Sequence, residues 1–106
     1  MSKSNDKYIL NEHGEPVVEP DLLTWGRWFE TSRASRIVKQ EHIGPSKVST
    51  VFLGLDHGWG DGPPILWETM VFEGPLSDEQ DRCSGSREQA LAMHERMVER
   101  VRKSIQ

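Results

Sequence analysis

The amino-acid sequence predicts a small α+β domain in which an antiparallel sheet carries two helices. Two runs of β-branched and aromatic residues, 48–55 and 65–72, flank a loop rich in glycine and proline, which predicts two paired strands. Apolar residues near the C-terminus recur at helical spacing. Neighbouring predicted strands are joined by loops and not by crossover helices, which favours antiparallel pairing and the α+β class. A chain of 106 residues has room for one domain, which we expect over residues 8–106 after a flexible tail of residues 1–7.

The first half of the chain predicts a hairpin, a helix and a strand. Two short apolar segments, 8–10 and 16–18, flank a polar loop and predict an N-terminal hairpin. A short helix rich in tryptophan should follow, because Asp21 is a suitable N-cap and apolar residues then recur at helical spacing to about residue 32–35. Residues 36–43 predict a strand with one rather polar face, closed by a Gly-Pro pair.

The C-terminal part predicts a short edge strand and a well-defined amphipathic helix. Residues 81–84 are the candidate edge strand. Ser86 and Gln89 then fit the capping-box pattern that begins a helix. This helix should lie across the sheet on its apolar stripe, which consists of Ala90, Leu91, His94, Met97, Val98, Val101 and Ile105.

Both faces of the two central strands are largely apolar. A sheet of this kind must be covered on both sides. The C-terminal helix can cover one face, and the tryptophan-rich helix can cover part of the other. We expect a second copy of the chain to cover the remainder, so the sequence predicts a homodimer.

Composition narrows the classes of partner. The formal charge is −4, from 13 basic and 17 acidic side chains. This balance argues against nucleic acid as a partner, because nonspecific binding to nucleic acid draws mainly on phosphate neutralisation by Lys and Arg. Cys83 is the single cysteine, so no intrachain disulfide and no cysteine-based zinc site are expected. No segment resembles a signal peptide or is long and apolar enough to span a bilayer, and we expect a cytoplasmic protein with no membrane partner.

The loop of residues 56–64 concentrates ionisable and aromatic groups among three glycines. Asp56 and His57 can supply a metal ligand or a base, or Asp56 can cap the turn while His57 is solvated. No spacing matches a known metal signature, and no glycine pattern matches a dinucleotide or phosphate-binding loop, so neither a metal nor a cofactor is predicted. Trp59 either folds back against the sheet or stacks on a ligand or a partner surface.

Three further residues are candidates for a ligand site. Glu68 lies in the middle of a strand that should be buried, so it either pairs with an arginine such as Arg82 or acts as a binding carboxylate with a raised pKa. His94 lies on the apolar stripe of the last helix and is either a satisfied core histidine or part of a pocket with Glu68 and Arg82. In such a pocket Arg82 would hold an anionic small ligand. The neighbouring Cys83 has no dedicated base.

Part of the sequence resembles a group of small uncharacterised proteins found in bacteriophages and prophages. The resemblance lies in the segments VSTVFLGLDH (48–57) and PILWETMVF (64–72), in the triplet that begins at Arg82, and in Gln89, Ala90 and His94. It covers most of the chain, from about residue 8 to residue 101. The group is expected to have an aromatic residue where this chain has Cys83. The resemblance implies a phage accessory protein and brings no known activity or site residue with it.

The sequence therefore favours a non-enzymatic binding module that acts in phage–host interplay, by binding a host protein or by sequestering a small ligand. One alternative is a small metal-dependent or acid-base hydrolase that uses Asp56, His57, Glu68 and His94. Such an enzyme needs these groups within hydrogen-bond reach of one substrate. A second alternative is a structural component of the virion, which would assemble into extended structures and not into a closed dimer.

Overall fold

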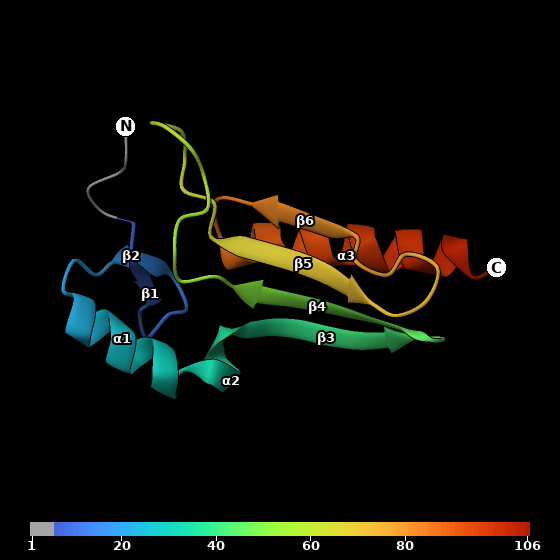
Figure 1. Ribbon diagram of the computed structural model, residues 1–106, viewed down its shortest axis with the longest axis horizontal. Helices are drawn as coiled ribbons and strands as arrows, with labels where there is room; N and C mark the ends of the chain where they lie inside the picture. Colours follow the sequence, from blue (N-terminus) through green and yellow to red (C-terminus); the bar gives the residue numbers. More distant parts are fainter. Residues whose placement is uncertain (1–5) are drawn as a thin grey trace.

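The computed structural model describes residues 6–106 and has the α+β architecture that the sequence predicts. A two-stranded antiparallel sheet pairs β1 (Tyr8–Leu10) with β2 (Pro16–Val18). A four-stranded antiparallel sheet has the order β3-β4-β5-β6, with β3 (Ile37–Ile43), β4 (Ser46–Phe52), β5 (Trp67–Phe72) and β6 (Gln80–Cys83). The helices are α1 (Leu22–Thr31), α2 (Arg33–Arg36) and α3 (Arg87–Ser104). Figure 1 shows α3 lying behind the larger sheet.

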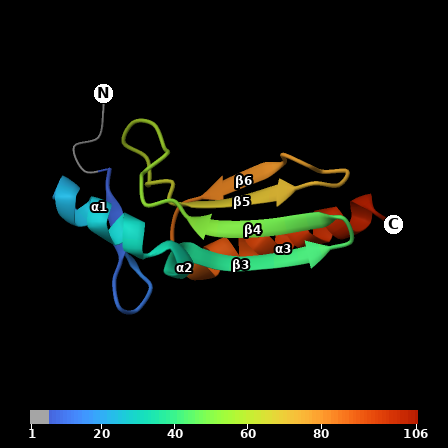
Figure 2. The ribbon, with the colours of Figure 1, turned by 60° about the horizontal axis from the view of Figure 1, so that its bottom comes forward.

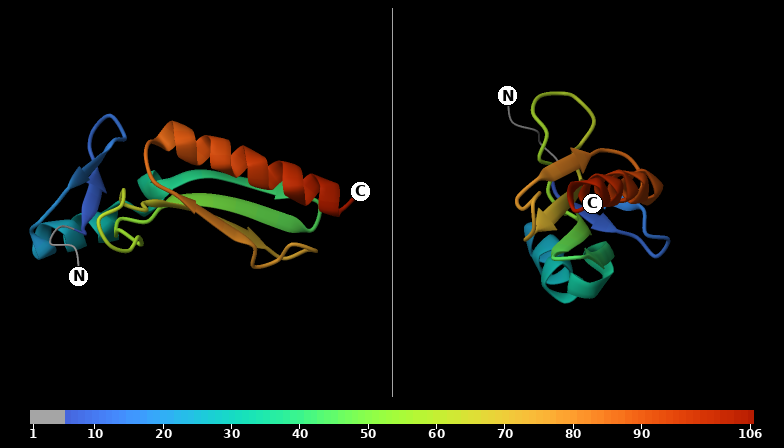
Figure 3. Two further views of the ribbon diagram at one scale, coloured as in Figure 1. Left: turned by 90° about the horizontal axis from the view of Figure 1, so that it is seen from above. Right: turned by 90° about the vertical axis from the view of Figure 1, so that its right-hand side faces the viewer.

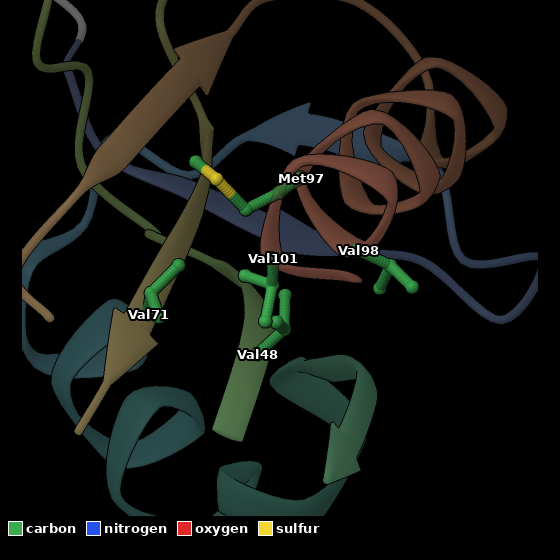
Figure 4. Packing of buried hydrophobic residues seen from close by; sticks show 5 residues of the cluster. All are labelled: Val48, Val71, Met97, Val98 and Val101. Carbon is green, nitrogen blue, oxygen red and sulfur yellow. The ribbon is translucent and has the colours of Figure 1, made fainter. Parts of the chain in front are cut away.

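The main core lies between α3 and the larger sheet. One of its two clusters, drawn in Figure 4, joins β4 and β5 to the second half of α3 through Val48, Val71, Met97, Val98 and Val101. The other joins the opposite ends of the same elements through Phe52, Leu66, Trp67, Ala90 and Met93. The predicted stripe of α3 is therefore largely confirmed, although Met93 also belongs to it and Ile105 is 37% exposed. The capping box of Ser86 and Gln89 is confirmed as well.

The N-terminal hairpin and α1 form a unit at one end of the larger sheet (Figure 2). The predicted tail, residues 1–7, lies mostly outside the described residues. Its last residue, Lys7, is bridged to Leu55, in the segment that follows β4. The indole nitrogen of Trp25 donates hydrogen bonds to the carbonyl oxygens of Tyr8 and Gly54, at 3.1 Å each. These contacts fix α1 against the point where the chain leaves β4.

The face of the sheet opposite α3, here called the open face, is uncovered along most of its length by the described residues (Figure 3). Alternation along the paired strands places on it Gln40, His42, Lys47, Ser49, Val51, Glu68, Met70, Phe72 and Arg82. Phe72 is 43% exposed there. The expectation that the tryptophan-rich helix covers part of this face holds only at one end, where α1 and α2 flank the sheet. The open face is more polar than the sequence runs suggested.

Candidate functional site

Trp59 stands almost wholly in solvent. The residue is 95% exposed, so of the two alternatives that the sequence left open, the one in which Trp59 folds back against the sheet is wrong. The loop that carries it is held at its base by Asp56, whose Oδ1 accepts hydrogen bonds from the backbone amides of Gly58 (2.7 Å) and Ile65 (2.8 Å). The prediction that Asp56 caps the turn is therefore confirmed. His57 lies in the same loop and is exposed.

Glu68 and Arg82 form the ion pair that the sequence offered as one of two alternatives. They are direct partners in the register of β5 and β6, and Arg82 Nε donates to Glu68 Oε2 at 2.7 Å. The glutamate side chain is 15% exposed and the arginine side chain 41% exposed. The charge of the Glu68 carboxylate is thus balanced by Arg82, near the β6 edge of the open face.

His94 lies on the other side of the sheet, between α3 and β4, and is fully buried. Its Nδ1 is 2.7 Å from the hydroxyl of Thr50, which in turn pairs with the hydroxyl of Thr69 on β5. Its Nε2 is 2.9 Å from Glu41 Oε1 on β3. The suggested pocket of Glu68, Arg82 and His94 is not formed, because His94 faces α3 while the ion pair faces away from it.

The outer end of this network contains groups that often bind a metal. Ligand atoms of Glu41, His94 and Glu95 lie within 4.8 Å of one another. However, the ammonium of Lys39 sits among them, 3.3 Å from Glu41 Oε1 and 2.9 Å from Glu95 Oε1. The hydrogen bond from His94 and the charge of Lys39 hold the pKa of Glu41 below its ordinary value, and the carboxylates of Glu95 and Glu41 raise the pKa of Lys39. The lysine thus supplies the positive charge that a cation would bring.

A cleft opens where α1 and α2 meet the open face. It has a volume of about 670 Å³ and is lined by Phe29, Glu30, Arg33, Arg36, Ile37, Gln40 and Val51. The guanidinium of Arg36 lies 3.7 Å from the centre of the Phe29 ring and donates to the Phe29 carbonyl oxygen and to Ser32 Oγ. Burial, and then the charge of Arg33, lower the pKa of Arg36. Within the described residues the side chain of Arg33 makes no hydrogen bond or ion pair.

Sequence reasoning missed this cleft and the partners of His94. The sequence does contain a pattern that could have indicated each of them. Arg33 and Arg36 are one helical turn apart, directly before a strand. Lys39 and Glu41 alternate on a strand, and so share the face that α3 covers.

Cys83 is not an activated nucleophile. Its side chain is partly buried, and burial, together with the nearby charge of Asp81, raises the pKa of the thiol. The thiolate, which is the reactive form, is therefore disfavoured at neutral pH.

The predicted site residues thus lie in three places: a loop (Asp56, His57 and Trp59), an ion pair on the open face, and a buried network under α3. Comparison with family models, with curated proteins and with solved structures found no match to this chain. Among residues 6–106, no helix is both long and apolar enough to cross a membrane.

Proposed function

We propose that this protein is a non-enzymatic binding module that acts in the cytoplasm of an infected host cell, as a phage accessory protein does, by engaging another protein. The resemblance of residues 48–57 and 64–72 to small phage and prophage proteins supports the setting. The exposure of Trp59 supports the mode of action, and it is the observation on which the proposal rests.

An exposed indole on a braced loop is suited to a protein contact. Burying a tryptophan side chain removes roughly 150–250 Å² from water, which is worth on the order of 4–6 kcal/mol before the costs of association. Tryptophan is enriched among the few residues that dominate binding energy at interfaces. Because Asp56 braces the base of the loop, less loop ordering has to accompany binding.

The open face supports a second part of the proposal, which is that the protein forms a homodimer. Met70 and Phe72 lie there with no covering element among the described residues. A two-fold pairing of this face would bury them and leave no free interface for further growth. A virion component would instead polymerise, so a closed dimer distinguishes the two alternatives.

The hydrolase alternative has weaker support. Catalytic groups must come within hydrogen-bond reach of one substrate. Here His94 is buried under α3, Glu68 is paired with Arg82 on the opposite face, and His57 belongs to the loop beyond β4.

The proposal is tested by replacing Trp59 with alanine in protein purified from infected host cells and examined by native mass spectrometry. We expect the wild-type chain to retain a stoichiometric protein partner and the Trp59→Ala variant to lose it, with no change in thermal midpoint. Leu23→Ala is the matched control, because Leu23 is 71% exposed on α1 and lies outside the loop.

Two results would count against the binding role of Trp59. One is the same partner at the same stoichiometry in the wild type and in Trp59→Ala. The other is a wild-type chain that carries no protein and instead retains a metal or a substrate-like molecule, which would favour the hydrolase.

A further inference from the structure

We infer that the surface which receives Trp59 is the Arg33/Arg36 cleft of a second copy of this chain, so that two copies bind each other reciprocally. The inference rests on the proposed function, since it takes Trp59 to be a protein-binding anchor, and it identifies the partner and the site.

The loop and the cleft are chemically complementary. The cleft offers apolar surface from Ile37 and Val51 beside two guanidinium groups, and an indole ring binds well against both kinds of surface. Asp61 follows Trp59 by two residues, is exposed, and makes no hydrogen bond or ion pair within the described residues. Its carboxylate would reach a guanidinium when Trp59 enters the cleft.

The charges of the cleft also call for an anion. Arg33 and Arg36 are close enough for the charge of one to act on the other, and Arg33 has no acidic partner in the described part of the chain. A carboxylate placed beside Arg33 would relieve this repulsion. Glu30 also lines the cleft, so two arginines against one carboxylate leave it with a net positive charge in a chain whose formal charge is −4, and Asp61 of a second copy supplies the opposite charge.

The positions of the two surfaces permit a closed pair. Figure 1 shows the loop of residues 56–64 and helix α2 on opposite sides of the same end of the four-stranded sheet. A two-fold axis that runs parallel to the strands in front of the open face exchanges these two sides. Such an axis sets each loop against the α2 side of the other copy, and it also brings the two open faces together. The interface would be isologous, with two identical contacts of loop and cleft.

The sizes are compatible as well. A cleft of about 670 Å³ falls in the range of sites that enclose a drug-sized ligand, and an indole is smaller than that. The contact between the open faces would also bury Met70 and Phe72. This adds to the area of the dimer interface, which in stable complexes is roughly 1,200–2,000 Å².

The test is a charge swap followed by sedimentation equilibrium of the purified chain. Arg33→Glu places like charges opposite each other in both contacts, and so does Asp61→Arg. We expect each single variant to weaken the dimer at least about tenfold, equivalent to about 1.4 kcal/mol or more summed over the two contacts. The double variant Arg33→Glu/Asp61→Arg restores opposite charges in both contacts, and should return to near wild-type affinity.

Trp59→Ala should also give monomers, and Leu23→Ala should remain dimeric. Arg33 and Asp61 are both exposed, and their side chains have no partner in the described residues, so the charge-swap variants should fold. Circular dichroism of each variant checks its folding. Arg36 is left unchanged because it packs on Phe29 and bonds to the end of α1.

Three outcomes would overturn the inference: a wild-type chain that stays monomeric at high concentration, a dimer that tolerates Arg33→Glu, or a double variant no tighter than the singles. A monomeric wild type that still loses a host protein on Trp59→Ala would refute this inference and leave the proposed function intact. A monomeric wild type with no Trp59-dependent partner would refute both.

Discussion

At the scale of single residues, the buried hydroxyl of Thr50 is the centre of the polar network under α3. It bonds at once to His94 Nδ1 and to the Thr69 hydroxyl, and all three side chains are fully buried. Thr50→Val keeps the shape of the side chain but removes the hydrogen bonds to His94 Nδ1 and to the Thr69 hydroxyl, while His94 Nε2 keeps its bond to Glu41. We expect a loss of about 1–3 kcal/mol in the free energy of unfolding, measured by urea denaturation.

Thr69→Val is the matched comparison. It removes only the terminal hydroxyl, and Thr50 keeps its bond to His94, so the loss should be smaller than for Thr50→Val. Equal losses, or a larger loss for Thr69→Val, would show that the network does not depend on Thr50.

Residue-level prediction from the sequence succeeded where the relevant partner was implied by local pattern. The pairing of Glu68 with Arg82 follows from a carboxylate in a buried strand that needs a nearby arginine. The exposure of Trp59 does not follow from its type, since a large apolar side chain is ordinarily expected to be covered. The partners of His94 depend on the register of β3 against β4 and on how α3 crosses the sheet, and neither is encoded in any short segment.

At the scale of elements, β3 and α3 are joined by a line of charges at the edge of the sheet. Glu41 faces His94 and Lys39, and Lys39 also reaches Glu95. Because these contacts hold the pKa of Glu41 below its ordinary value of about 4.5, the native chain favours the charged form more than the unfolded chain does. This contribution to stability is complete above that pH, and it is lost as the pH falls below it.

Glu41→Gln should therefore cost about 1 kcal/mol of stability at neutral pH, and the difference from the wild type should shrink as the pH is lowered from 5 to 3. Chemical denaturation across this pH range measures it. Glu99→Gln is the control, because Glu99 is exposed on α3 and takes part in no described side-chain contact. A deficit for Glu41→Gln that stays constant to pH 3 would contradict the assignment.

The elements themselves were largely predictable because each carries a local signal. The capping box begins α3 and the Gly-Pro pair separates β3 from β4, as expected. The boundary between α1 and α2 was not resolved from the sequence, since Ser32 is compatible with continuation of the helix and the break depends on contacts made by Arg36.

At the scale of the whole molecule, the N-terminal unit meets the rest of the chain at one end of the larger sheet. The N-terminal unit of the hairpin and α1 is tied to the end of β4 by backbone bonds, including the one from Tyr8 N to Gly54 O at 2.8 Å. The Trp25 indole also donates to the Gly54 carbonyl oxygen there, and to that of Tyr8 in the hairpin. The core cluster of Val48, Val71, Met97, Val98 and Val101 lies away from this junction (Figure 2), whereas Tyr8, Leu10 and Trp28 of the N-terminal unit pack against the cluster that contains Phe52. Such an arrangement should allow the first unit to open while the core remains folded.

Trp25→Phe removes the indole donor and keeps an aromatic ring beside Phe29. In the native chain the ring centres of Trp25 and Phe29 are 5.0 Å apart. We expect the amide of Tyr8 to exchange roughly five-fold faster, equivalent to about 1 kcal/mol, while amides of β4 and α3 are unchanged. Native-state hydrogen exchange measures both regions in one experiment. Trp28→Phe is the comparison variant: Trp28 packs on the core through Phe52 and its indole donates no hydrogen bond within the described residues, so its effect reports lost packing and not a lost donor. If Trp25→Phe accelerated exchange equally in the hairpin and in the core, the two units would unfold together and the junction would not be a separate point of opening.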